Sequence, residues 1–159
     1  MTQTTITIKD LANILSAEIS GDPTRVAADV THDSRQVREG TVFVAIKGST
    51  VDGHRFIDDV LRRGASAIIS EQPRPDGFEG TWLRVENARK ALAVAAAAVN
   101  GNPSHDLHLV GITGTNGKTT TTYLCFALAE AAGQFPAMLT TVEYRIGETS
   151  QEAIRTTPE

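Results

Sequence analysis

The sequence has few of the features that mark specialised classes of protein. It holds one cysteine, Cys125, so it cannot form an internal disulfide, and a reducing compartment is permitted. Aromatic residues make up only 5% of the 159 residues, and 15 Lys and Arg are outnumbered by 19 Asp and Glu. The net charge of −4 lacks the basic excess typical of nucleic-acid-binding proteins. These values exclude a disulfide scaffold and low-complexity disorder, and we expect no nucleic-acid partner.

Long apolar runs are also absent. The most apolar run, residues 91–99, is mostly alanine and is far shorter than the roughly 18 residues that span a bilayer. Residues 1–9 are rich in threonine and lack the basic segment and apolar core of a secretory signal. We therefore expect no membrane insertion and a cytoplasmic location.

Apolar periodicity predicts strands that alternate with helices, which is typical of the α/β fold class. Thr7 and Asp10 carry the signal for a capped first helix. The β-prone run at 41–46 is typical of a strand buried on both faces. The expected strands cover residues 26–30, 41–46, 67–69, 82–85, 107–113 and 137–144, and the expected helices begin near residues 7, 56, 87 and 119.

A break in the pattern at residues 101–104 (GNPS) is the best candidate for a domain boundary. It separates residues 1–103, enough for one small α/β domain, from residues 104–159. The second segment has the expected order strand, loop, helix and strand, and it begins a second α/β domain.

Residues 114–120 (GTNGKTT) lie between an expected strand and an expected helix, where a phosphate-binding loop is found. Glycines let backbone N–H groups surround phosphate oxygens, a lysine neutralises their charge, and a Ser or Thr hydroxyl joins the Mg²⁺ shell. The first glycine of the generic pattern is missing, because position 112 is Ile112, so a glycine-rich turn with an incidental lysine is the alternative. The candidate ATP-binding residues are Gly114, Thr115, Asn116, Gly117, Lys118, Thr119 and Thr120.

A second polar segment, residues 31–35 (THDSR), follows an expected strand. It could form a polar cradle for a phosphorylated ligand, with Arg35 as the anion partner. It could instead be a turn in which Asp33 and Ser34 form hydrogen bonds with the local backbone. Residue chemistry alone favours this second interpretation.

Other reactive residue types fit structural roles. Cys125 is expected to pack in the core, and His54 to begin a helix. His105 and His108 have no metal-ligand partners at suitable spacing, and no Ser/His/Asp catalytic set stands out.

Taken together, the ordered motifs resemble those of the Mur ligases, the ATP-dependent amide ligases that build the peptidoglycan stem peptide. The N-terminal motifs resemble the family's nucleotide-sugar-binding domain, and residues 113–121 resemble its ATP loop, which also lacks the first glycine. The GTNGKTT loop and the later Thr-Thr-Pro at 156–158 are similar to the third ligase of the pathway. The fourth ligase usually carries Lys-Glu where this chain has Thr122-Tyr123. The N-terminal motifs are residues 33–35 (DSR), 39–48 (EGTVFVAIKG), 52–57 (DGHRFI) and 64–67 (GASA).

The resemblance implies a reaction. ATP phosphorylates the free carboxylate of UDP-N-acetylmuramoyl-L-alanyl-D-glutamate, and the amine of L-lysine or meso-diaminopimelate then displaces phosphate. It implies that residues 1–103 bind the UDP-linked dipeptide and that residues 104–159 begin the ATP-binding domain. Lys118 would be catalytic, and Thr119 would bind Mg²⁺. The residues that match substrate contacts are His32, Ser34, Ser49, Thr50, Val51, Thr156 and Thr157.

The resemblance covers only about the first third of such an enzyme. We therefore expect a fragment that is inactive alone and leaves a strand edge and apolar faces uncovered. Two alternatives stay open: a UDP-sugar and ATP binding module without catalysis, and another Mur-type ligase such as the D-alanyl-D-alanine-adding enzyme.

Overall fold

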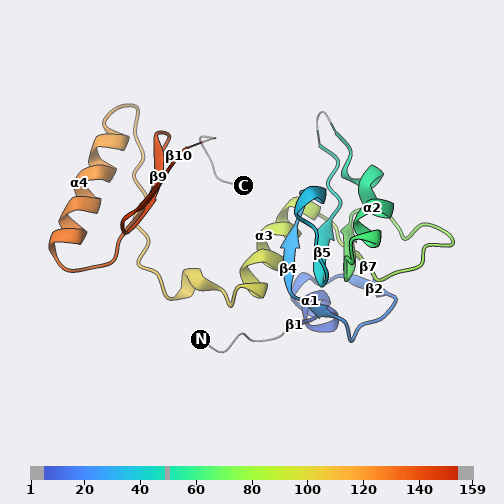
Figure 1. Ribbon diagram of the computed structural model, residues 1–159. Helices are drawn as coiled ribbons and strands as arrows, with labels where there is room; N and C mark the ends of the chain where they lie inside the picture. Colours follow the sequence, from blue (N-terminus) through green and yellow to red (C-terminus); the bar gives the residue numbers. More distant parts are fainter. Residues whose placement is uncertain (1–5, 49–50, 154–159) are drawn as a thin grey trace. The chain divides into compact units, whose positions relative to one another are not determined.

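In the computed structural model, which describes residues 6–48 and 51–153, the chain forms two compact units, residues 1–107 and 108–159 (Figure 1). The first unit is a layered α/β structure, and the second pairs one helix with a small antiparallel sheet. The α/β fold class predicted from the sequence is confirmed. Among the described residues, no helix is long and apolar enough to cross a membrane.

A five-stranded sheet of order β2-β7-β6-β5-β4 forms the centre of the first unit. Strands β4 to β7 are parallel, and the edge strand β2 is antiparallel to β7. The five strands are β2 (Glu18–Ser20), β4 (Asp29–Thr31), β5 (Thr41–Val44), β6 (Ala67–Ser70) and β7 (Trp82–Arg84). A separate two-stranded pair joins β1 (Ile6–Thr7) to β3 (Val26–Ala27).

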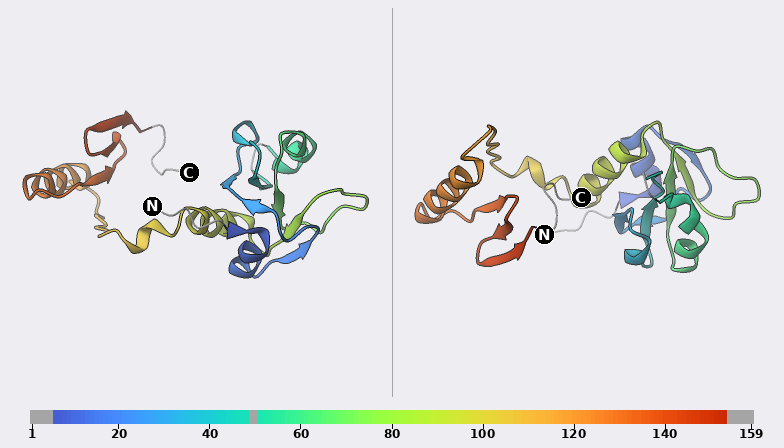
Figure 2. Two further views of the ribbon diagram at one scale, coloured as in Figure 1. Left: turned by 60° about the horizontal axis from the view of Figure 1, so that its bottom comes forward. Right: turned by 90° about the horizontal axis from the view of Figure 1, so that it is seen from above.

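Helices cover both faces of this sheet (Figures 1 and 2). On one face α1 (Ile8–Leu15) and α3 (Ala88–Val99) pack on alternate strand residues such as Val42 and Ile69. On the other face α2 (Ile57–Arg62) packs near Phe43 and Trp82. All four residues of β5 are buried, as predicted for the run at 41–46. Three short 3-10 helices complete the described helices of this unit: η1 (Ser34–Gln36), η2 (Gly53–Phe56) and η3 (Pro103–His105).

The predicted signals that start and stop the helices are confirmed. Thr7 caps α1, and the Asp10 side chain accepts a hydrogen bond from the Thr7 N–H to complete a capping box. Asn87 caps α3 by accepting from the Lys90 N–H at 2.8 Å. Gly64, just after α2, has a φ of +91°, which a residue with a side chain rarely adopts.

The second unit consists of α4 (Lys118–Ala131) and the antiparallel sheet β10-β9-β8. Among its described residues the buried apolar side chains are Phe126 and Met138, and the Arg145 guanidinium lies 4.6 Å from the Phe126 ring centroid. The Tyr123 hydroxyl donates to Glu143 at 2.6 Å and ties α4 to the sheet. The strands are β8 (Ala137–Leu139), β9 (Glu143–Ile146) and β10 (Thr149–Glu152).

Two strand predictions in this part of the chain are wrong. Residues 107–113 form no strand, because no neighbouring strand in the described chain pairs with them, and unpaired backbone is left in water. Residues 137–144 form two strands instead of one. The chain turns where the Thr140 hydroxyl accepts from the N–H groups of Val142 and Glu143, at 3.1 and 3.0 Å.

The prediction that Cys125 packs in the core is also wrong, because this residue is exposed. Leu124 and Leu128 of the same helix are exposed as well, Leu128 by 71%. The sheet covers the Phe126 side of α4, and no described element covers the leucine side. The expected uncovered apolar faces are therefore present in this unit, where Val110 is 77% exposed.

Candidate functional site

The loop before α4 has the backbone geometry of an anion-binding turn. Gly114 and Gly117 have φ values of +144° and +79°, and nothing lies within 4 Å of a Cβ built on Gly117. Helix α4 begins directly after Gly117 and has no side-chain cap and no acidic residue in its first turn. Its first N–H groups and the positive end of its dipole therefore stay available to an anion.

Lys118 lies over this loop. Its Nζ donates to the carbonyl oxygens of Gly114 at 2.7 Å and Thr115 at 3.3 Å, and the side chain is exposed. An ammonium held there can exchange carbonyl partners for phosphate oxygens with little movement, because both contacts compete with water. The loop residues predicted to bind ATP therefore lie together, from Gly114 to Thr120, at one helix end.

Thr119 is half-buried in the first turn of α4. A hydroxyl in that place can join the shell of a Mg²⁺ ion whose other ligands are phosphate oxygens and waters. Within residues 6–48 and 51–153, no group of three or more His, Cys, Asp or Glu side chains could hold a metal.

The predicted substrate residues of the first unit follow parallel strands. His32 and Ser34 come directly after β4, and Val51 lies in the loop after β5. Because β4 and β5 are parallel neighbours, their carboxyl ends meet at one edge of the sheet, where α/β proteins bind ligands. The structure brings these two segments to the same edge.

The turn at residues 31–36 is held by its own side chains. The Arg35 guanidinium donates to both Asp33 carboxylate oxygens, with the closest pair at 2.7 Å, and the Asp33 N–H donates to the Thr31 hydroxyl at 3.1 Å. The hydrogen bond from Arg35 lowers the pKa of Asp33 to about 2, and the Arg35 backbone N–H adds to the effect. Asp33 therefore accepts from the local backbone, as the predicted turn requires, and its carboxylate also pairs with the Arg35 side chain.

After β5, residues 46–48 and 51–53 pair as the two arms of a hairpin, which the sequence did not predict. The Gly48 N–H donates to Val51 O at 3.0 Å, the Gly53 N–H donates to Ile46 O at 2.9 Å, and the backbones of Lys47 and Asp52 form an isolated antiparallel β-bridge. A Cβ on Gly53 would lie 2.9 Å from the Ile46 backbone, so only glycine lets the two arms approach.

The structure also brings together a Ser/His/Asp set that the sequence did not reveal. His54 Nδ1 lies 2.6 Å from Asp52 Oδ1, and His54 Nε2 lies 2.8 Å from the hydroxyl of Ser70, the last residue of β6. The serine is 16 residues further along the chain, so spacing alone gives no signal for it. As predicted, His54 lies in the first turn of a helix, η2.

Four predicted substrate residues, Ser49, Thr50, Thr156 and Thr157, lie outside the described residues. Their roles stay predictions.

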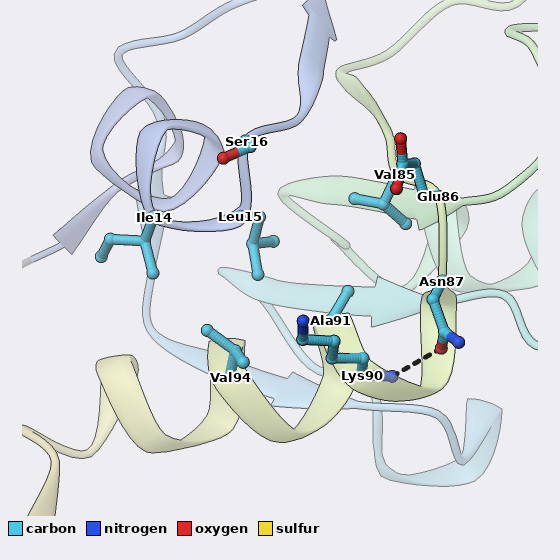
Figure 3. Close-up of a pocket in the computed structure, with 9 residues that line it drawn as sticks. All are labelled: Ile14, Leu15, Ser16, Val85, Glu86, Asn87, Lys90, Ala91 and Val94. Carbon is cyan, nitrogen blue, oxygen red and sulfur yellow. Dashed lines mark hydrogen bonds between the residues drawn. The ribbon is translucent and has the colours of Figure 1, made fainter.

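A cavity of about 390 Å³ lies between the end of α1 and the start of α3 (Figure 3). Leu15 and Val94 form part of its apolar wall, and Lys90 reaches its rim. None of the predicted site residues that the structure describes lines it. Within the first unit, this cavity is therefore separate from His32, Ser34 and Val51.

Comparison with protein families gives two matches along the chain. Residues 27–100 match the family described as "Mur ligase family, catalytic domain", and residues 112–159 match "Mur ligase middle domain". The two matched segments contain the two candidate sites.

Curated relatives of high similarity carry ligase names. The chain is 44% identical over 155 residues to the UDP-N-acetylmuramoyl-L-alanyl-D-glutamate--2,6-diaminopimelate ligase of Geobacter metallireducens, covering 96% of this chain and 30% of that protein. It is 45% identical to the UDP-N-acetylmuramyl-tripeptide synthetase of a Roseiflexus species, covering 83% of this chain and 26% of that protein. The chain thus spans less than a third of the length of these relatives.

Solved structures agree with these matches. MurF from Acinetobacter baumannii is similar with a TM-score of 0.64 and 26% identity, covering 82% of this chain and 29% of that one. MurF ligase from Thermotoga maritima, solved in complex with ADP, is 36% identical over 66% of this chain and 24% of that one, with a TM-score of 0.50.

Proposed function

The chain belongs to the Mur ligase family, and from this premise we propose that it forms part of an ATP-dependent ligase of peptidoglycan precursor synthesis. The proposed reaction adds a diamino acid to UDP-N-acetylmuramoyl-L-alanyl-D-glutamate. The observation that supports it most is the loop at 114–118, whose positive-φ glycines and lysine lead into an uncapped helix. The ADP complex of the Thermotoga relative and the names of the curated relatives support the same proposal.

In this proposal each of the two units binds a different substrate. Residues 1–103 bind the UDP-linked dipeptide at the carboxyl ends of β4 and β5, and residues 104–159 contribute the ATP loop. The start of α4 and Lys118 orient the triphosphate and spread the charge that develops on the transferred phosphoryl group. Mg²⁺, held by Thr119 and the phosphates, supplies charge neutralisation when bound.

The chemistry then follows two steps. The peptide carboxylate attacks the γ-phosphorus of ATP, which forms an acyl phosphate and releases ADP. The amine of the diamino acid attacks the acyl carbon, the C–O bond to phosphate breaks, and the amine loses a proton as the amide forms. The chain spans under a third of its relatives, so we propose that it does not complete these steps alone.

The test is made on the complete reading frame that contains this chain. ADP release is measured with ATP, Mg²⁺, the UDP-linked dipeptide and either meso-diaminopimelate or L-lysine. We expect release only when dipeptide and one diamino acid are both present, and at least a hundredfold less with Lys118→Ala, in line with losing a transition-state charge contact. Release that needs neither substrate, or unchanged turnover in Lys118→Ala, would overturn the assignment.

A binding module without catalysis is the second candidate. Its support is that the loop at 114–120 and three predicted substrate residues, His32, Ser34 and Val51, lie within the described residues of this short chain. If the complete reading frame binds the UDP-linked dipeptide in calorimetry but never releases ADP, this second function replaces the first.

A further inference from the structure

The Asp52, His54 and Ser70 side chains form a continuous chain of hydrogen bonds across the first unit. Asp52 Oδ1 accepts from the His54 backbone N–H at 3.0 Å and lies 2.6 Å from Nδ1. His54 Nε2 then reaches the Ser70 hydroxyl at 2.8 Å. The histidine side chain is 16% exposed and Ser70 is fully buried, so water competes little at the inner end.

The same residue types in the same order activate the nucleophile of serine hydrolases. Ser70 cannot serve that purpose, because its side chain is fully buried. A nucleophile needs access to its substrate. The three residues therefore hold structure in place.

The hydrogen-bond pattern assigns the histidine tautomer. The Asp52 carboxylate can only accept, so His54 Nδ1 carries the proton between them. The Ser70 oxygen already accepts from Gln72, and the acceptor that the described part of the chain offers its O–H is His54 Nε2. Neutral His54 with the proton on Nδ1 satisfies every one of these groups.

The outer end of this chain of bonds lies on one arm of the hairpin after β5. The Asp52 backbone forms an isolated antiparallel β-bridge with Lys47 on the other arm, and the next residue, Gly53, donates its N–H to Ile46 O. The inner end is fixed to the carboxyl end of β6, the parallel neighbour of β5. The hairpin after β5 is thereby tied to the next strand of the sheet.

We propose that Asp52, His54 and Ser70 act as a positioning relay that holds residues 51–54 against the carboxyl end of β6, at the edge of the sheet where the UDP-linked substrate is proposed to bind. This inference rests on the proposed function of the first unit. None of the three is a catalytic residue. His54 acts through the backbone of the hairpin, so its loss weakens substrate binding.

The strand β6 offers a matched control for the test. Ser66 and Ser70 flank and end the same strand, and both are buried serines whose hydroxyls make one hydrogen bond to a partner distant in sequence. Ser66 donates to Gly40 O at 3.0 Å, at the amino end, away from the candidate edge. Ser66→Ala and Ser70→Ala therefore remove the same group from opposite ends of one strand.

The experiment measures affinity for UDP-N-acetylmuramoyl-L-alanyl-D-glutamate by calorimetry on the complete reading frame that contains this chain. We expect Ser70→Ala and His54→Phe to raise the Kd about tenfold, which is the factor that loss of one hydrogen bond can produce. Ser66→Ala should leave the Kd within about twofold of the wild type, since the hydrogen bond that it removes lies at the other end of β6, away from the site. If His54→Phe does not fold, His54→Asn serves, because its amide still donates toward Asp52 and cannot reach Ser70.

Hydrogen exchange at the Gly48 and Gly53 amides gives a second readout that needs no ligand. Both amides should exchange about tenfold faster in His54→Phe than in Ser66→Ala, because local opening becomes easier when the relay is cut. Unchanged exchange overturns the relay whatever the calorimetry shows. Unchanged Kd in the Ser70 and His54 variants, with a wild type that binds, overturns its role in binding. A wild type that does not bind overturns the proposed function and, with it, this role.

Discussion

Removing the Lys118 side chain should separate nucleotide binding from stability. In the free chain Nζ contacts two exposed carbonyl oxygens, those of Gly114 and Thr115, at 2.7 and 3.3 Å. Water can replace exposed hydrogen bonds of this kind at little cost, so Lys118→Ala should change the free energy of unfolding by no more than about 0.5 kcal/mol. Bound phosphate would replace those carbonyls with charge-assisted hydrogen bonds worth about 1.5–3 kcal/mol. The Kd for ATP should therefore rise roughly 10- to 150-fold.

The assay is a calorimetric titration of ATP with Mg²⁺ into the chain, paired with thermal melting followed by circular dichroism. Lys90→Ala is the control, because it makes the same change in net charge on α3, in the other unit. Its Kd should stay within about twofold of the wild type, apart from long-range screening effects that added salt removes. If Lys118→Ala binds ATP as tightly as Lys90→Ala does, the ammonium does not serve the phosphates and the reasoning fails.

Two further predictions concern stability. Ile69 is fully buried in β6, between β5 and β7, so Ile69→Ala should lower the free energy of unfolding by about 2–5 kcal/mol. Leu128→Ala should change it by less than about 0.5 kcal/mol, because Leu128 is exposed. Equal losses of unfolding free energy in chemical denaturation would contradict the exposed face of α4. Asp33 has its pKa lowered to about 2 by Arg35, so the pair stabilises the fold above the ordinary pKa of 3.8, and this contribution disappears as the pH falls toward 2. The difference in unfolding free energy between wild type and Arg35→Ala should follow that course, and an NMR titration midpoint for Asp33 near 3.8 in the wild type would refute it.

Sequence patterns predicted the first unit well because its elements combine local signals with buried cores. The run at 41–46 is apolar on both faces because α1 and α3 cover one side and α2 the other. The caps at Thr7 and Asn87 depend on residues within three positions, which a single sequence displays directly. The edge strand β2 was missed, since three residues with Ile19 as the one large apolar side chain carry no period.

The second unit was predicted less well because its apolar pattern lacks matching contacts. Residues 107–113 and the leucines of α4 have the composition of buried elements, yet the described chain offers them no cover. Periodicity reports which face of an element is apolar and gives no account of whether a partner is present. Cys125 was likewise predicted to be buried from its apolar surroundings in the sequence, and it is exposed because its helix face is uncovered.

The candidate sites show the same division between local and distant information. The loop at 114–120 was recognised because its residue types and spacing are contiguous. The relay was missed because Ser70 joins Asp52 and His54 only through the register of β5 on β6. A hydrogen bond between residues on different strands becomes visible only when the sheet order is known.

The antiparallel edge strand has a consequence for synthesis of the chain on the ribosome. Glu18 pairs with Arg84, 66 residues later, so β2 has no partner until β7 has emerged. At translation rates of about 5–20 residues per second, that wait lasts roughly 3–13 s. During this interval α1 and the first strands hold apolar surface that nascent-chain chaperones can bind. The first unit therefore completes its sheet late in its own synthesis, and variants that slow the pairing of β2 with β7 should lower the yield of folded chain more than they lower its equilibrium stability.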